Sequence, residues 1–213
     1  MRITVFGAAG SVGSRVVTEA LARGHEVHAV VRNRARFGEV PPAASPRIGD
    51  ASRIEDVVEL SQGQDVVISA TRPADGREQA LVTTARALVA GTRETGTRLV
   101  VVGGAATLAV PGKGGLLVLD DPEYIPPAWR AIAEACRDQH EVFRNVSDID
   151  WTYVSPPALL EPGTRLGTYR LGRDELVLDA QGISRISVED FAVALLDEVE
   201  QPRHRRARFT AAY

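Results

Sequence analysis

Residues 2–13 read Arg2-Ile-Thr-Val-Phe6 and then Gly7-Ala-Ala-Gly-Ser-Val-Gly13, so a strand-like run passes directly into a turn with a glycine at every third position. The residues from Ser11 to Ala22 have the apolar spacing of an amphipathic helix, which Gly24 closes. A glycine-rich turn between a strand and a helix predicts a dinucleotide-binding βαβ unit. A tight corner without a ligand would also favour small residues, but the strand, the helix and the spacing together favour the nucleotide.

Each glycine of this motif has an expected role. The first permits the sharp turn, the second lets a pyrophosphate approach the backbone, and the third allows the helix to pack closely on the strand. The pyrophosphate would meet free N–H groups at the positive end of the helix dipole. The candidate phosphate-binding residues are Gly7, Ala9, Gly10, Ser11, Val12 and Gly13.

Beyond this unit, short β-branched runs alternate with longer helical stretches, a pattern that indicates a parallel sheet covered on both faces. We therefore expect an α/β fold of the doubly wound, mostly parallel Rossmann type with a small C-terminal extension on the substrate side. The expected strands are Arg2–Phe6, Glu26–Val31, a weak one near Arg47–Ile48, Asp65–Ala70, Arg98–Val102, Asp150–Val154, Gly182–Ile186 and Arg208–Ala212. The expected helices are Ser11–Ala22, Arg53–Leu60 with a Ser52/Glu55 capping box, Gly76–Thr95, one from Pro127 to about Val146, and Val188–Val199.

Length and composition fit one globular domain. The chain has 213 residues, of which 44% are hydrophobic and 25% charged. We expect a single domain over residues 1–213, with 1–154 as the dinucleotide-binding core and 155–213 supplying substrate-side loops and a closing helix and strand. Two segments rich in Gly and Pro, Gly103–Pro127 and Ser155–Gly172, follow sheet strands and should lie at the carboxyl edge, where open α/β sheets bind ligands.

Charge, cysteine content and hydropathy argue against a nucleic-acid partner, a disulfide and a membrane span. A net charge of -3 offers no basic face for nucleic acid. Cys136 is the only cysteine, so no intramolecular disulfide can form. The N-terminal apolar run is too short for a signal-peptide core, and no run approaches the length of a membrane span. We expect a cytoplasmic protein, monomeric or homodimeric, whose partner is a small molecule.

The end of the second expected strand bears on the choice of cofactor. An NAD site would place an acid there to bond the ribose 2′-OH, whereas this sequence has Val31-Arg32-Asn33-Arg34. A guanidinium can form a fork on a 2′-phosphate, so Arg32 favours NADP(H), with NAD(H) as the alternative. A basic surface turn without a ligand is the competing interpretation.

The ends of three later strands supply the rest of the expected cofactor site. Ala70, Thr71 and Arg72 follow the fourth strand, where small residues let the backbone reach the ribose and phosphates. Gly103 and Gly104 end the fifth strand and would leave room for the nicotinamide. Ser155 and Pro156 would border that ring on its other side.

The sequence argues against the usual chemistry of alcohol-oxidising short-chain enzymes. Their Tyr-x-x-x-Lys pair needs a lysine, but Lys113 is the only one and Ala109 lies four residues before it. The expected positions in the fourth helix hold Ala133 and Arg137. A flavin or quinone would relax the requirement because its conjugated ring takes hydride directly and solvent can supply the proton. A flavin would then be a substrate or acceptor rather than a tightly bound group.

Four stretches resemble a known family. They are Asp150–Pro157, Glu161–Gly172, Ile183–Asp197 and Arg208-Phe-Thr. With the glycine motif, they are similar to the atypical short-chain dehydrogenases/reductases described as NADH-flavin reductases, and more distantly to biliverdin reductase B and NmrA-like proteins. The resemblance implies that Asp50, followed by Ala51, contacts the adenine amino group; a plain helix-flanking acid is the alternative. Relative to biliverdin reductase B, Gly103-Gly104-Ala105 lacks a serine at the acceptor face.

No catalytic residue stands out. His140 and Tyr124 are weak candidates, since a packed histidine and a loop aromatic are the simpler interpretations. Cys136 is expected to be a buried structural thiol. His25, His28 and His204 have no ligand partners at metal-binding spacing, so no metal site is expected.

Three functions fit these features. The leading hypothesis is an NADPH-dependent reductase that delivers hydride to a flavin, a quinone or a similar flat acceptor. A regulatory protein that senses NADP(H) without turnover, like the NmrA proteins, would equally lack the Tyr-Lys pair. A tailoring reductase for an aromatic natural product is the third.

Overall fold

The glycine turn joins strand β1 (Arg2–Phe6) to helix α1 (Ser11–Ala22), and β2 (Glu26–Val31) returns parallel to β1, as the sequence predicts. The computed structural model describes all residues 1–213. The remaining elements are η1 (Arg34–Glu39), β3 (Ser45–Ile48), α2 (Ile54–Ser61), β4 (Val66–Ser69), α3 (Ala80–Thr95), β5 (Arg98–Val102), η2 (Val118–Asp120), η3 (Pro127–Trp129), α4 (Arg130–Arg144), β6 (Trp151–Ser155), β7 (Leu159–Glu161), β8 (Arg170–Gly172), β9 (Arg185–Ser187), α5 (Val188–Glu200) and β10 (Ala207–Ala212).

The main sheet has eight strands in the order β3-β2-β1-β4-β5-β6-β10-β8. All neighbours run parallel except β8, which is antiparallel to β10 at the edge, while β7 and β9 form a separate parallel pair. The first six strands have the strand order of a Rossmann fold, which confirms the predicted fold class. Parallel strands place their carboxyl ends at one edge, and that edge carries the glycine turn.

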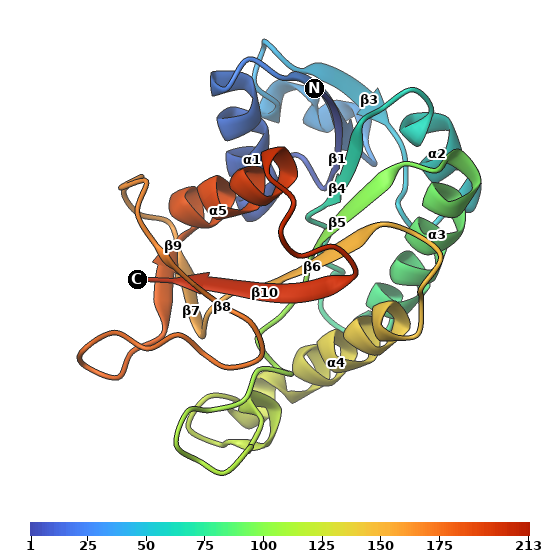
Figure 1. Ribbon diagram of the computed structural model, residues 1–213. Helices are drawn as coiled ribbons and strands as arrows, with labels where there is room; N and C mark the ends of the chain where they lie inside the picture. The colour runs from blue at the N-terminus through green and yellow to red at the C-terminus, as the bar shows by residue number, and fades with distance from the viewer.

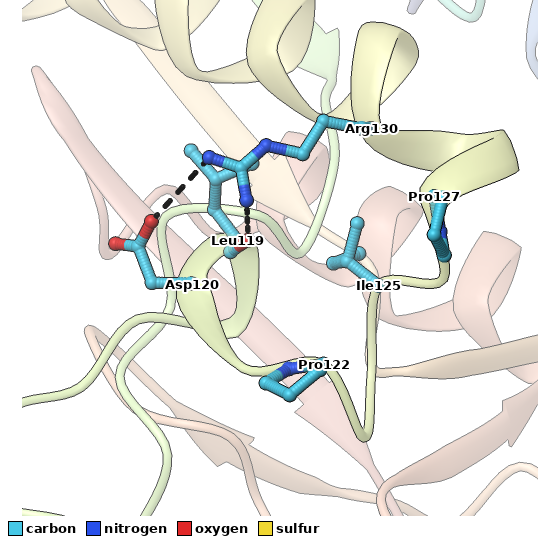
Figure 2. Close-up of a pocket in the computed structure, with 6 residues that line it drawn as sticks. All are labelled: Leu119, Asp120, Pro122, Ile125, Pro127 and Arg130. Atoms are coloured by element: carbon cyan, nitrogen blue, oxygen red, sulfur yellow. Dashed lines mark hydrogen bonds and ion pairs between the residues drawn. The ribbon is translucent and has the colours of Figure 1, made fainter.

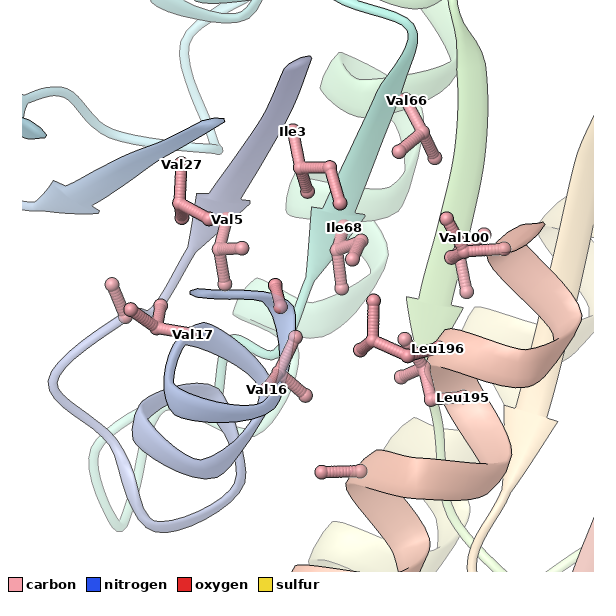
Figure 3. Close-up of a cluster of buried hydrophobic side chains, with 14 of the residues drawn as sticks. Ile3, Val5, Val16, Val17, Val27, Val66, Ile68, Val100, Leu195 and Leu196 are labelled. Carbon is pink, nitrogen blue, oxygen red and sulfur yellow. The ribbon is translucent and has the colours of Figure 1, made fainter. Parts of the chain in front are cut away.

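Two helical layers cover the sheet. Helices α1 and α5 lie on one face, and α2, α3 and α4 lie on the other (Figure 1). The core under α1 and α5 interleaves strand valines and isoleucines with helix residues such as Val16, Leu195 and Leu196 (Figure 3). The opposite core is built around Phe143, Trp151 and Tyr153. This double coverage explains why the strands are nearly continuous apolar runs.

Several expected boundaries differ from the structure. The predicted Ser52/Glu55 capping box is wrong: α2 begins at Ile54 without a side-chain cap, because the Ser52 hydroxyl donates to Asp50 instead. Helix α3 begins at Ala80 rather than Gly76, where the backbone turns with a φ of 78°. The helix expected from Pro127 begins as the short helix η3 and continues as α4 to Arg144. Strands β7 and β8 were not predicted, because they have only three residues each and give no periodic pattern in the sequence.

Much of the segment Ser155–Gly172 is fastened to α1 and α5. Arg165 donates to both carboxylate oxygens of the buried Glu19, at 2.8 and 2.9 Å, and Asp190 accepts the backbone N–H groups of Leu166 and Gly167. The hydrogen bond from Arg165 lowers the pKa of Glu19 to about 2, burial opposes it, and Arg23 lowers it further. This part of the segment is therefore a covering strap over two helices rather than a free loop.

The strap gives the protein an acid-sensitive contact. Because the folded-state pKa of Glu19 lies below its ordinary 4.5, the ion pair stabilises the fold above that pH and is lost as the pH falls toward 2. We expect Glu19→Gln to destabilise the protein by at most about 3 kcal/mol at pH 6. In urea unfolding, the difference in the free energy of unfolding between wild type and variant should become smaller as the pH is lowered from 5 to 3. Glu141→Gln, which removes an exposed carboxylate, is the control. A difference for Glu19→Gln that stays constant with pH would contradict the assignment.

Candidate functional site

The glycine turn, residues 7–13, forms a cradle in which no Cβ fits at Gly7 or Gly13. Gly7 has a φ of 78°, and a Cβ there would lie 2.5 Å from the carbonyl oxygen of Ala70. A Cβ on Gly13 would lie 2.1 Å from the carbonyl oxygen of Gly7. Gly10 caps α1 in an extended conformation without any side-chain cap. The expected sharp turn at Gly7 and the expected close packing at Gly13 are both present, because the backbone around each leaves no room for a side chain.

The start of α1 leaves its amide donors free. The first N–H of the helix that finds an acceptor is that of Ser14, which bonds the Gly10 carbonyl at 2.9 Å. The N–H groups of Ser11, Val12 and Gly13 have no acceptor in the protein. Unpaired donors at the positive end of a helix bind anions, so the cradle fits a pyrophosphate.

The end of β4 forms the floor beside this cradle. The Ala70 N–H bonds the Phe6 carbonyl at 3.0 Å, and the Thr71 and Ser69 hydroxyls are 3.1 Å apart. Arg72 is exposed just beyond them. The predicted residues Ala70, Thr71 and Arg72 therefore border the glycine turn, as their order along the chain suggests.

The end of β2, where adenosine is expected, carries charged groups besides Arg32. Arg32 is exposed at the end of β2, and Asp50 lies close enough to feel its charge. Burial raises the pKa of Asp50, but hydrogen bonds from Ser52 and the charges of Arg32 and Arg53 outweigh burial, so this pKa lies below its ordinary value.

Arg36 was not among the predicted site residues. Its guanidinium donates to the Ala9 carbonyl of the glycine turn at 2.9 Å and to the Glu39 carboxylate at 2.7 and 3.0 Å. Arg36 reaches the Ala9 carbonyl because the chain forms the short helix η1, which was not predicted. The only indication in the sequence was the run of arginines after β2.

Gly103 and Gly104 are needed for packing inside the protein. A Cβ on Gly103 would lie 1.9 Å from the Tyr153 ring, and one on Gly104 would lie 2.7 Å from the Cys136 sulfur. The Gly104 N–H donates to the Tyr153 hydroxyl at 3.3 Å. Their missing side chains thus make room for Tyr153 and Cys136, a different reason from the expected space for nicotinamide.

The weak catalytic candidates lie in different surroundings. Tyr124 packs against an apolar cluster formed by the segment after β5, around Leu108 and Val118. His140 is buried on α4, and burial together with the Arg208 charge lowers its pKa to about 4. Burial raises the pKa of the Cys136 thiol to about 11, as expected of a structural cysteine.

A polar group on the α4 side of the sheet was missed by the sequence analysis. Arg208 of β10 donates to the Thr107 hydroxyl and carbonyl at 2.6 and 3.0 Å, and to Asp174 at 2.6 Å. The Thr107 hydroxyl lies 3.3 Å from Nδ1 of His140. The predicted Ser155 is fully buried at the end of β6, and its hydroxyl has no partner, while Pro156 is half-buried.

A hollow on the surface lies apart from these residues. Its volume is about 400 Å³, and its lining comes from η2 and the approach to α4: Leu119, Asp120, Pro122, Ile125, Pro127 and Arg130. Figure 2 shows Arg130 bonded across it to the Leu119 carbonyl, at 3.3 Å, and paired with Asp120 at 3.8 Å. None of the predicted site residues lines this hollow.

The helices and the possible metal-ligating side chains were compared with what a membrane span and a metal site require. None of the helices is both long and apolar enough to span a bilayer. Nowhere do three or more His, Cys, Asp or Glu side chains gather as metal ligands would.

Comparison with known proteins identifies relatives along the whole chain. The family model for NAD(P)H-binding proteins matches residues 7–199. The uncharacterized protein YwnB of Bacillus subtilis is 36% identical over 212 residues, 99% of this chain and 97% of YwnB. The 3-diazoavenalumate denitrifying reductase of a Streptomyces species is 29% identical over 177 residues, 77% of this chain, and the match spans 58% of that reductase.

Solved structures of similar proteins have the same fold. A candidate exported protein from Burkholderia pseudomallei has 42% identity and a TM-score of 0.89, with 100% of both chains covered. A candidate NADH-flavin reductase from Streptococcus pneumoniae has 30% identity and a TM-score of 0.88, covering 100% of this chain and 99% of that one. The glycine cradle, the strand order and these matches lead to one conclusion: the chain belongs to the NAD(P)H-binding family and has the Rossmann fold of nicotinamide-dependent oxidoreductases.

Proposed function

We propose that the protein is an NADPH-dependent reductase that passes hydride to a flavin, a quinone or a similar flat conjugated acceptor. The observation that carries this proposal is the glycine cradle, where three amide N–H groups at the start of α1 have no acceptor in the protein. Bound NADPH would supply the hydride. Gly7, Ala9, Gly10, Ser11, Val12 and Gly13 would hold its pyrophosphate. Ala70–Arg72, the Gly103-Gly104 backbone, Ser155 and Pro156 would border the ribose and the nicotinamide.

The preference for NADPH rests on positive charge at the adenosine end. Arg32 would grip the 2′-phosphate, and Arg36 reaches the same side of the glycine turn through the Ala9 carbonyl. Asp50, adjacent to Ala51, would accept a hydrogen bond from the adenine amino group, and its lowered pKa favours the ionised carboxylate.

The choice of acceptor rests on the surroundings of α4. Ala133 is buried where a catalytic tyrosine would stand, and Arg137 is paired with Asp138. Lys113 is held by Asp121 and Glu123 at 2.8 and 2.6 Å. A reaction without a Tyr-Lys pair needs an acceptor that delocalises the incoming charge in its own ring, as flavins and quinones do.

The test is anaerobic oxidation of NADPH in the presence of FMN, FAD or a naphthoquinone, followed by absorbance at 340 nm. Turnover with at least one acceptor supports the proposal. Tight binding of NADPH without oxidation by any acceptor would refute the proposed reductase activity and would favour a sensor like the NmrA proteins. Turnover only with an aromatic natural product would favour a tailoring enzyme, a candidate supported by the similarity to the Streptomyces reductase.

Arg32 provides a separate test of the cofactor. We expect Arg32→Ala to weaken NADPH binding at least tenfold, about 1.4 kcal/mol, while NADH binding changes little. Arg34→Ala is the matched control, since the Arg34 guanidinium stacks over the Phe37 ring at 5.8 Å. Titration of each variant with both nucleotides measures the effect, and equal losses for NADPH and NADH would reject the assignment.

The proposal also covers the setting in which the protein works. We infer a single domain over residues 1–213, a monomer or homodimer that works on a small molecule in the cytoplasm. Fractionation of the native host is the check on location, because one structural neighbour is named as a candidate exported protein.

A further inference from the structure

The polar group behind the end of β5 links a buried cation to a buried imidazole. The Arg208 side chain is 8% exposed, and its guanidinium is fixed by the Thr107 carbonyl, the Thr107 hydroxyl and Asp174. Thr107 comes from the segment after β5, Arg208 from β10 and Asp174 from the turn after β8. Three parts of the chain therefore meet at the Arg208 guanidinium, and the Thr107 hydroxyl oxygen that it contacts lies 3.3 Å from Nδ1 of His140.

The direction of these hydrogen bonds follows from the chemistry of the groups. A guanidinium only donates, so the Thr107 oxygen accepts from Arg208. The hydroxyl hydrogen can then be donated to Nδ1 of His140, which lies 3.3 Å away. If Nδ1 accepts, the ring proton of a neutral imidazole must sit on Nε2.

His140 is held close to the expected acceptor side. Its ring packs against Tyr153 with centroids 4.7 Å apart and planes tilted by 43°, and the Tyr153 hydroxyl accepts the N–H of Gly104 at the end of β5. Nε2 makes no hydrogen bond within the protein and is not among the fully buried polar atoms without a partner, so it retains contact with the exterior.

Two hydroxyls on the same face of the sheet also lack partners. Ser155 and Thr210 are paired neighbours on β6 and β10, both fully buried, and neither hydroxyl is hydrogen-bonded. They point to the side of Tyr153 and Arg208, because alternate residues of a strand share a face. Unsatisfied buried hydroxyls are costly, so they mark the place where a polar ligand edge is expected.

We propose that Arg208 and Thr107 fix His140 as its Nε2–H tautomer, and that this N–H donates a hydrogen bond to the carbonyl-bearing edge of the hydride acceptor. This inference rests on the proposed function. His140 is the group that touches the acceptor, and Thr107 and Arg208 are positioning residues. The acceptor gains two electrons with the hydride while NADPH becomes NADP+. The negative charge that appears on the acceptor is stabilised by the N–H and is neutralised by a proton from solvent, so His140 stays neutral throughout.

The surroundings of His140 favour a neutral donor over an imidazolium acid. Burial first, and then the cations Arg208 and Arg144, lower its pKa to about 4, against a smaller opposing effect of Glu141 and Asp174. The other titratable groups packed near it are Tyr153, whose pKa burial raises, and Cys136, whose pKa burial raises to about 11. His140, Tyr153 and Cys136 therefore do not change charge between pH 6 and 8, so this tautomer persists across that range.

The first test is ¹⁵N NMR of the imidazole groups, with His140→Gln used to assign the signal. We expect a neutral Nε2–H ring from pH 6 to 8 in the wild type and in Thr107→Ser. In Thr107→Val, which keeps the shape but loses the hydroxyl, we expect the tautomer preference to disappear. A protonated Nδ1 in the wild type, or titration of His140 above pH 6, would overturn the proposal.

The second test is kinetic. Loss of one preorganised donor should lower kcat about 100-fold in His140→Phe, and loss of its orientation about tenfold in Thr107→Val, with KM nearly unchanged. Thr107→Ser should recover most of the rate, and wild-type kinetics in Thr107→Val would overturn the positioning role. If no acceptor supports turnover, the proposed function fails and His140 is tested separately: addition of FMN to the NADP+-loaded protein should shift its Nε2 signal, and an unmoved signal refutes the contact.

Discussion

Gly13→Ala is expected to abolish measurable NADPH binding and to lower the free energy of unfolding. The added Cβ would lie 2.1 Å from the Gly7 carbonyl oxygen, 2.8 Å from its carbonyl carbon and 3.2 Å from the Ala8 Cα. All three atoms belong to the backbone of the cradle, so no side chain can move aside. Either α1 lifts from β1 or the turn rearranges, and both changes displace the amide donors. We expect a loss of about 1–3 kcal/mol of stability and at least a 100-fold loss of NADPH affinity, about 2.7 kcal/mol.

The matched control is Gly38→Ala, which adds the same methyl group where nothing lies within 4 Å. Calorimetric titration and urea unfolding of the two variants beside wild type separate the local clash from the general effect of removing a glycine. If Gly13→Ala binds NADPH as the wild type does, the phosphate does not lie at this turn.

The second large effect is expected at the opposite edge of the sheet. Arg98 begins β5 with its side chain 9% exposed, and it donates at 2.9 Å to Glu198, whose side chain is 3% exposed. It also donates to the carbonyls of Glu198 and Val199 and to the Thr152 hydroxyl. Arg98→Met would remove all these donors and leave the buried Glu198 carboxylate with only the Arg203 and His204 backbone N–H groups and the His204 ring as partners. We expect a loss of about 3–5 kcal/mol, because removing one partner of a buried ion pair is far costlier than losing a surface pair.

Arg93→Met is the control for this prediction. Arg93 and Asp148 form an ion pair at 2.6 Å, but their side chains are 47% and 57% exposed, so its loss should cost less than about 1 kcal/mol. The double variant Arg98→Met/Glu198→Gln should recover part of the stability, since it removes the stranded charge as well. Urea unfolding measures all four proteins, and an Arg98→Met variant as stable as Arg93→Met would disprove the account.

The sequence predicted those features that depend on local pattern. β1, α1, β2 and β5 were predicted with the observed boundaries, because β-branched runs and the glycine turn act within a few residues of themselves. The cradle was equally predictable, since Gly7 needs its positive φ and Gly13 packs against the Gly7 carbonyl, both within the motif. The Ala70 carbonyl that also excludes a Cβ at Gly7 lies on another strand. The Ser52 capping box failed because a nearer carboxylate, Asp50, competes for the same hydroxyl.

The features that escaped prediction depend on distant partners. Thr107 and Arg208 are 101 residues apart, and Arg165 and Glu19 are 146 apart, so no periodicity in the sequence joins them. Gly103 was singled out correctly as a residue that must be small, but the reason, the Tyr153 ring beneath it, required the pairing of β5 with β6. Short strands such as β7 and β8 form because the sheet edge and β9 offer partners, a property of the assembled fold.

The buried ion pair at the start of β5 has a consequence for engineering. Its charges lie at the amino ends of the strands, whereas the glycine cradle lies at their carboxyl ends. Changes that widen the range of acceptors usually cost stability. In this protein such losses can be offset by strengthening contacts around Glu198, a full strand length away, without disturbing the nucleotide. Laboratory evolution could therefore treat the two ends of the sheet as separate targets.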